Sequence, residues 1–80
     1  MKTRFLVYSN RREDIDEIQR IFSDLPEVEL AWVEDSRLMG VHLEVPFVAR
    51  EADGMRFRGF DVMRSFVKEV KHGHQDVAAA

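Results

Sequence analysis

The sequence predicts a single small α/β domain, and three observations carry this prediction. The chain has 80 residues, which is the size of one domain. Short apolar runs rich in β-branched and aromatic residues alternate with two longer stretches in which apolar residues recur at helical spacing. A hairpin signal lies in the second half of the chain. The expected element order is therefore β-α-β-β-β-α, with four strands in a mixed sheet and two helices.

The first half of the chain has the pattern of a βαβ unit. Residues 4–8 are apolar on both faces, which favours a central strand covered on both sides. Asn10, with Glu13 three residues later, has the pattern of a helix start, and apolar residues then recur at helical spacing until Pro26 ends the helix. Residues 28–33 alternate as a second strand. Two strands joined by a helix at this spacing are expected to be parallel.

A β-hairpin is expected between residues 45 and 58. Asp53-Gly54 is a strong turn signal, because a tight turn with positive φ favours glycine. The two arms are residues 45–50 and residues 55–58, both short and partly apolar. The segment between the second strand and this hairpin is only about a dozen residues long and largely polar at its start.

Capping signals predict the last helix and the end of the domain. Asp61 is expected to cap a helix with one apolar stripe, and Gly73 is expected to end it. Residues 74–80 show no periodicity, so we expect a single domain over residues 1–73 and a disordered C-terminal tail. A ferredoxin-like sheet is an alternative with similar elements, but it requires a further strand after this helix, and residues 74–80 make a poor strand.

Composition argues against several classes of function. The chain has no cysteine, so it can form neither a disulfide nor a thiolate nucleophile or ligand. The formal net charge of −3 argues against a nucleic-acid partner, which usually requires a basic excess. The longest apolar run is far shorter than the roughly 20 residues that cross a bilayer. We expect a cytoplasmic protein with neither nucleic acid nor membrane as a partner.

Three short motifs, in the right order along the chain, resemble those of the thioredoxin and glutaredoxin superfamily. Residues 7–9, Val-Tyr-Ser, resemble the end of the first glutaredoxin strand, and residues 45–46, Val-Pro, resemble the start of the third strand, where the family has a cis proline. Residues 59–63, Gly-Phe-Asp-Val-Met, resemble the start of the last glutaredoxin helix. The family's Cys-Pro-Tyr-Cys falls on residues 13–16, Glu-Asp-Ile-Asp, so thiol redox chemistry is excluded.

The resemblance implies a thioredoxin-like fold in which the helix between the second and third strands is missing or reduced to a turn. Both remaining helices would then lie on one face of the sheet, and the other face would present apolar residues such as Leu6 and Tyr8. Large apolar patches are rare on monomers. We therefore expect this face or a sheet edge to meet a second copy or a partner protein, with Leu6, Tyr8 and Trp32 as contact residues. Alternatively, residues 38–43 fold back over the face.

Structural roles account for the residues able to carry chemistry, so no catalytic residue, metal ligand or cofactor is expected. The acidic residues at positions 13–17 suit the first turn of a helix. Ser9 has no histidine nearby in the sequence, and a serine without a base is not a nucleophile. His72 and His74 form a His-x-His pair, but the sequence places no third ligand beside them.

The resemblance also suggests a remnant ligand site. In glutaredoxins the backbone beside the cis proline and an acidic residue at the last helix hold glutathione, and these positions match Val45, Pro46 and Asp61. The leading hypothesis is nevertheless a non-catalytic protein-binding or regulatory module. A glutathione-like small-molecule binder, or a thiol-free relative of glutathione-using enzymes, is the alternative, and a small structural subunit is a third.

Overall fold

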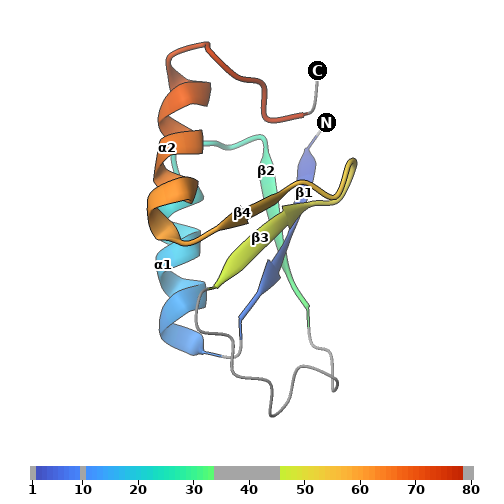
Figure 1. Ribbon diagram of the computed structural model, residues 1–80, viewed down its shortest axis with the longest axis vertical. Coiled ribbons are helices and arrows are strands. Elements are labelled where there is room, and N and C mark those ends of the chain that lie inside the picture. Colours follow the sequence, from blue (N-terminus) through green and yellow to red (C-terminus); the bar gives the residue numbers. More distant parts are fainter. Residues whose placement is uncertain (1, 10, 34–45, 79–80) are drawn as a thin grey trace.

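The computed structural model describes residues 2–9, 11–33 and 46–78, and these residues form an α/β fold. The elements in chain order are β1 (Thr3–Tyr8), α1 (Arg12–Phe22), β2 (Val28–Trp32), β3 (Phe47–Arg50), β4 (Arg56–Arg58) and α2 (Phe60–Lys71). The described strands form one sheet in the order β2-β1-β3-β4 (Figure 1). β1 is parallel to β2 and antiparallel to β3, and β3 is antiparallel to β4. The expected element order and mixed sheet are confirmed.

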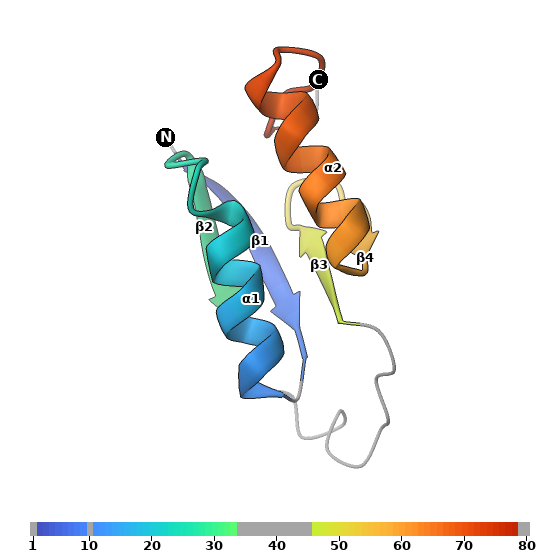
Figure 2. The same ribbon diagram turned by 90° about the vertical axis from the view of Figure 1, so that its left-hand side faces the viewer.

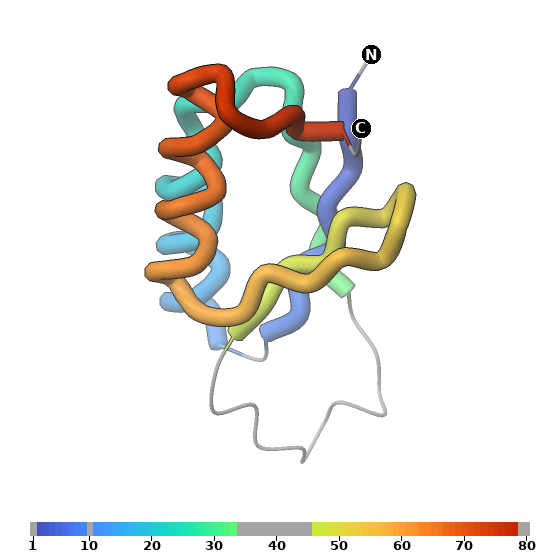
Figure 3. The backbone as a smooth tube through the Cα atoms, turned by 45° about the horizontal axis from the view of Figure 1, so that its top comes forward, coloured from blue at the N-terminus to red at the C-terminus, as the bar shows by residue number. Residues whose placement is uncertain are grey.

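Both helices lie on the same face of the sheet. α1 covers β1 and β2, and α2 covers β3 and β4 (Figure 2). The tube view shows the same two layers, with the two helices on the left and the strands on the right (Figure 3). The hydrophobic core fills the space between the layers. Its largest fully buried side chains are Phe5, Ile18, Met63, Val7 and Val48.

The ends of α1 differ from the sequence expectation. The helix begins at Arg12 with Arg11 as N-cap, and no side chain caps it. Asn10, the expected cap, lies outside the described residues. The helix ends at Phe22 instead of running up to Pro26, because the chain leaves the helix in successive turns. The backbone N–H of Leu25 donates to the Phe22 carbonyl at 3.0 Å, and the Leu25 side chain is still buried in the core.

Asp61 does not cap α2, so this prediction was wrong. The N-cap is Gly59, whose φ of 87° belongs to the region that favours glycine, and Asp61 lies within the first helical turn. The acidic side chain still suits that turn, because the helix dipole is positive there. Gly73 follows the helix with φ of 78°, and its N–H donates to the Val70 carbonyl at 3.0 Å. The expected glycine at the end of the helix is confirmed.

The β3–β4 hairpin forms where expected, but its connection is longer than a tight two-residue turn. Arg50 N–H donates to the Met55 carbonyl at 2.8 Å, and Gly54 N–H donates to the Arg50 carbonyl at 2.7 Å. Gly54 has φ of 72°, which explains the glycine at this position. Residues 51–55 therefore form a loop of five residues between β3 and β4, where a tight turn would have two.

Val77 is buried against the domain although it lies in the segment predicted to be a disordered tail, whereas residues 74–76 and 78 are exposed. Val77 is only 3% exposed and belongs to the core. Its carbonyl accepts a hydrogen bond of 3.1 Å from Nη1 of Arg50, which is itself buried. The Arg50 guanidinium also binds Asp53 through Nε at 3.0 Å and Nη2 at 2.8 Å. We call Arg50, Asp53 and Val77 the Arg50 cluster; it joins the hairpin to the C-terminal segment.

The Arg50 cluster predicts a specific acid sensitivity. Hydrogen bonding from Arg50, and then from the Met55 backbone, lowers the pKa of Asp53 from 3.8 to about 2. A lowered carboxyl pKa contributes stability above the unfolded-state value, and this contribution is lost as the pH falls through the folded-state value. We expect Asp53→Asn to unfold more easily than the wild type near neutral pH. The difference in unfolding free energy should shrink between about pH 4 and pH 2, as measured by urea denaturation.

Candidate functional site

The sheet face turned away from the helices is the candidate site. Among residues 2–9, 11–33 and 46–78 no helix or strand packs on it, and we call it the uncovered sheet face. Strand register places every second residue on it, because side chains alternate between the two faces of a sheet. In β1, Phe5 and Val7 point into the core, whereas Leu6 and Tyr8 lie on the uncovered side. The positions that share this uncovered sheet face are Arg4, Leu6, Tyr8, Glu29, Ala31, Phe47, Ala49, Arg56 and Arg58.

The centre of the uncovered sheet face is apolar. Tyr8 pairs with Phe47 across β1 and β3, and their rings stack with centroids 4.7 Å apart and planes 11° apart. Leu6 lies between Ala31 of β2 and Ala49 of β3 in the register. Leu6, Tyr8 and Phe47 are half-buried. A continuous apolar strip therefore crosses the middle of the sheet. The alternative cover, residues 38–43, lies outside the described residues.

Charged side chains border this strip. On β4, the Arg56 guanidinium lies 5.4 Å from the centroid of the Phe47 ring, and Arg58 is exposed beside it. On β2, at the opposite border, Glu29 is exposed. Sequence reasoning did not include Phe47, Arg56 or Arg58 among the contact residues. These three residues alternate with the buried Val48 and Phe57, so they lie on the same sheet face as Leu6 and Tyr8. The sequence shows this alternation, but it assigns the face only when the hairpin register is known.

Trp32 does not share the uncovered sheet face with Leu6 and Tyr8. The register pairs it with Val7, so its side chain starts on the helix side of edge strand β2. The residue is 49% exposed, and its indole N–H donates to the Ser9 carbonyl at 3.1 Å. The residues named as contacts from the sequence therefore belong to two surfaces: Leu6 and Tyr8 to one, Trp32 to the other.

Ser9 organises the entrance to α1. Its side chain is buried, and its Oγ accepts a hydrogen bond of 3.1 Å from the Arg11 backbone N–H. The same hydroxyl donates to Asp14 Oδ2 at 3.1 Å. Asp16 pairs with Arg12 on the exposed side of the helix. These contacts fix the first turn of the helix, and no described histidine lies in them.

The corner that the sequence suggested as a remnant ligand site, Val45, Pro46 and Asp61, is only partly described. The Pro46 carbonyl accepts a hydrogen bond of 2.9 Å from Gly59 N–H, which places the start of β3 beside the start of α2. The Asp61 side chain is fully exposed and pairs with Arg64 Nη1 at 3.2 Å. Val45 lies outside the described residues. Pro46 and the first turn of α2 are thus neighbours, but the Asp61 carboxylate is directed to a surface arginine.

The two histidines after α2 have separate surroundings. His74 Nδ1 lies 3.1 Å from Glu69 Oε2, and the His72 and His74 ring centroids are 6.1 Å apart. In the part of the chain that the structure describes, no three histidine or carboxylate side chains come together as a metal site requires. The His-x-His pair of the sequence therefore has no third ligand among these residues.

No family model matches the chain, and no curated protein or solved structure matches it either. Over residues 2–9, 11–33 and 46–78, neither helix has the length and apolar character needed to cross a bilayer. The uncovered sheet face, with its stacked aromatic pair, is the surface that a binding function can use.

Proposed function

We propose that the chain is a non-catalytic interaction module on a thioredoxin-like scaffold, and that it binds a second copy of itself through the uncovered sheet face. The observation that carries this proposal is the apolar strip of Leu6, Tyr8 and Phe47 on the face that neither helix covers. Such a strip on a small domain favours association, because burying apolar surface in an interface removes it from water.

The scaffold part of the proposal rests on the element order. A βαβ unit is followed by a β-hairpin and a helix, and both helices share one face, as the sequence resemblance implies. Because the chain has no cysteine, it lacks the thiol chemistry of that superfamily and can use only its surfaces. A scaffold without thiols is therefore proposed to act by binding.

Charge at the borders favours a symmetric pair of chains. A two-fold axis parallel to the strands, lying between two stacked sheets, places β4 of one copy opposite β2 of the other. Arg56, which is two residues along the strands from the level of Glu29, would then lie near Glu29 of the second copy. Arg4 on the same face is already paired with Glu51 at 3.4 Å. The apolar strips would pack against each other in the centre, which is where aromatic residues contribute most to binding.

Leu6→Asp tests the uncovered sheet face. We expect the wild type to form dimers and the variant to remain folded but dissociate, with a dissociation constant at least about tenfold higher, because a carboxylate would be buried against the partner's apolar strip. Light scattering coupled to size-exclusion chromatography, over a range of concentrations, measures the mass. Circular dichroism measures the fold.

Val62→Asp is the matched control. Val62 is also an apolar residue, 48% exposed, but it lies on α2 away from the sheet, so the same change should leave the dimer intact. A wild type of monomer mass at all concentrations contradicts the proposed self-association. Unfolding of Leu6→Asp would show that Leu6 belongs to a core and would reject the face as an interface.

A glutathione-like ligand is a second candidate, favoured by the bond between Pro46 and Gly59 that sets the start of β3 beside the start of α2. The first-turn amides of α2 would offer hydrogen bonds and a positive dipole end to a carboxylate ligand. Addition of glutathione should then shift the amide signals of Gly59 and Asp61 in an NMR titration. No shift at millimolar glutathione rejects this candidate.

A further inference from the structure

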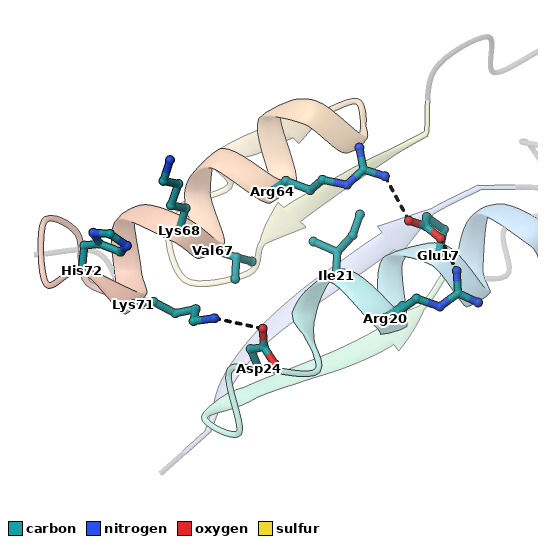
Figure 4. A pocket seen from close by; sticks show the side chains of 9 residues that line it. All are labelled: Glu17, Arg20, Ile21, Asp24, Arg64, Val67, Lys68, Lys71 and His72. Carbon is teal, nitrogen blue, oxygen red and sulfur yellow. Dashed lines mark hydrogen bonds and ion pairs between the residues drawn. The ribbon is translucent and has the colours of Figure 1, made fainter.

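A groove between α1 and α2 lies on the opposite side of the molecule from the uncovered sheet face. It has a volume of about 390 Å³ and is lined by both helices. Ile21 of α1 and Val67 of α2 point toward each other across it (Figure 4). Val67 is buried and Ile21 is half-buried. The floor of the groove is therefore apolar.

The charge of the groove is opposite in sign to the charge of the chain. Four cations and two anions line it, a net charge of +2 from 4 − 2, whereas the whole chain carries −3. Both anions are held in ion pairs that cross between the helices. Glu17 pairs with Arg64 at 3.0 Å at one end, and Asp24 pairs with Lys71 at 3.1 Å at the other (Figure 4).

Two further cations, Lys68 and Arg20, line the groove in addition to those of the two cross-helix pairs. Lys68 is located between the two cross-helix pairs on α2, and among the described residues no carboxylate lies within 4.0 Å of its ammonium group. Arg20 shares Glu17 with Arg64, so one carboxylate faces two guanidinium groups. His72 lies one turn after Lys68 and also lines the groove.

We propose that this groove binds an acidic segment of a partner protein that inserts an apolar side chain between Ile21 and Val67. Three of the four cations, Arg64, Lys68 and Lys71, are spread along two turns of α2, a length of about 10 Å, and do not converge on one point. A single small anion could use only part of this charge and none of the apolar floor. A segment with several carboxylates and an apolar side chain uses both.

A peptide titration tests the groove. The probe is a short synthetic peptide of alternating glutamate and leucine, added to the ¹⁵N-labelled protein and followed by NMR. We expect amide shifts at Ile21, Val67 and Lys68, and an affinity that falls as salt is added. Lys68→Glu changes the groove charge from +2 to 0 and should weaken peptide binding by about tenfold.

Lys2→Glu provides a matched control, because it makes the same charge change at an exposed position before β1. It should bind the peptide like the wild type. The proposal is overturned if a lysine and leucine peptide binds equally well, if the two variants lose affinity equally, or if the shifts fall on the uncovered sheet face. Displacement of the acidic peptide by millimolar inorganic phosphate would identify a simple anion site and would also overturn it.

Discussion

Replacement of Phe5 by alanine is expected to unfold a large fraction of the protein at room temperature. Phe5 is fully buried at the centre of β1. Its ring centroid lies 5.5 Å from that of Phe22, 5.9 Å from Phe66 and 6.0 Å from Phe57, so it joins both helices to the sheet. A buried phenylalanine truncated to alanine costs about 3–5 kcal/mol. A domain of this size has roughly 5 kcal/mol of stability in total.

Urea denaturation of Phe5→Ala, compared with Phe60→Ala, measures this effect. Phe60 is half-buried at the start of α2 and packs against the edge of the core, so its truncation should cost only about 1–2 kcal/mol. The comparison holds residue type and change constant, and the two side chains differ in burial. Equal losses for the two variants would contradict the description of Phe5 as the centre of the core.

Local patterns in the sequence were enough to predict the elements and their order. The alternation in β1 already separates Phe5 and Val7 from Leu6 and Tyr8, and the structure puts these pairs on opposite faces of the sheet. Gly54 and Gly73 were identified from positions where positive φ is needed, and both have it. These features depend on neighbouring residues only, so one sequence is sufficient to find them.

Features that depend on distant pairing could not be predicted in the same way. Val77 stands between three polar residues and three alanines, so it has no period to indicate that it is buried. Arg50 has the side chain of a surface residue, and its burial follows from partners three and 27 positions away. The groove between the helices likewise needs the relative position of Glu17 and Arg64, which only the packed structure supplies.

Arg50→Ala is expected to destabilise the fold and to release the C-terminal segment. The Arg50 side chain is buried and donates to both Asp53 and the Val77 carbonyl, so its removal leaves a cavity and unpaired acceptors. We expect a loss of about 2–4 kcal/mol in unfolding free energy. The Val77 methyl signals should also lose their core chemical shifts, and residues 74–78 should become sensitive to proteases at temperatures where the rest of the domain remains folded.

Arg4→Ala is the control that separates the effect of burial from the loss of an arginine–carboxylate pair. Arg4 is also an arginine on a central strand and also pairs with a carboxylate, but its side chain is 53% exposed and its partner Glu51 is 50% exposed. An exposed pair contributes at most about 1 kcal/mol, because water solvates both charges when the pair is broken. If the two arginine variants lose the same stability, burial does not strengthen the Arg50 cluster. If Arg50→Ala alone frees Val77, the buried arginine is what attaches the C-terminal segment to the hairpin.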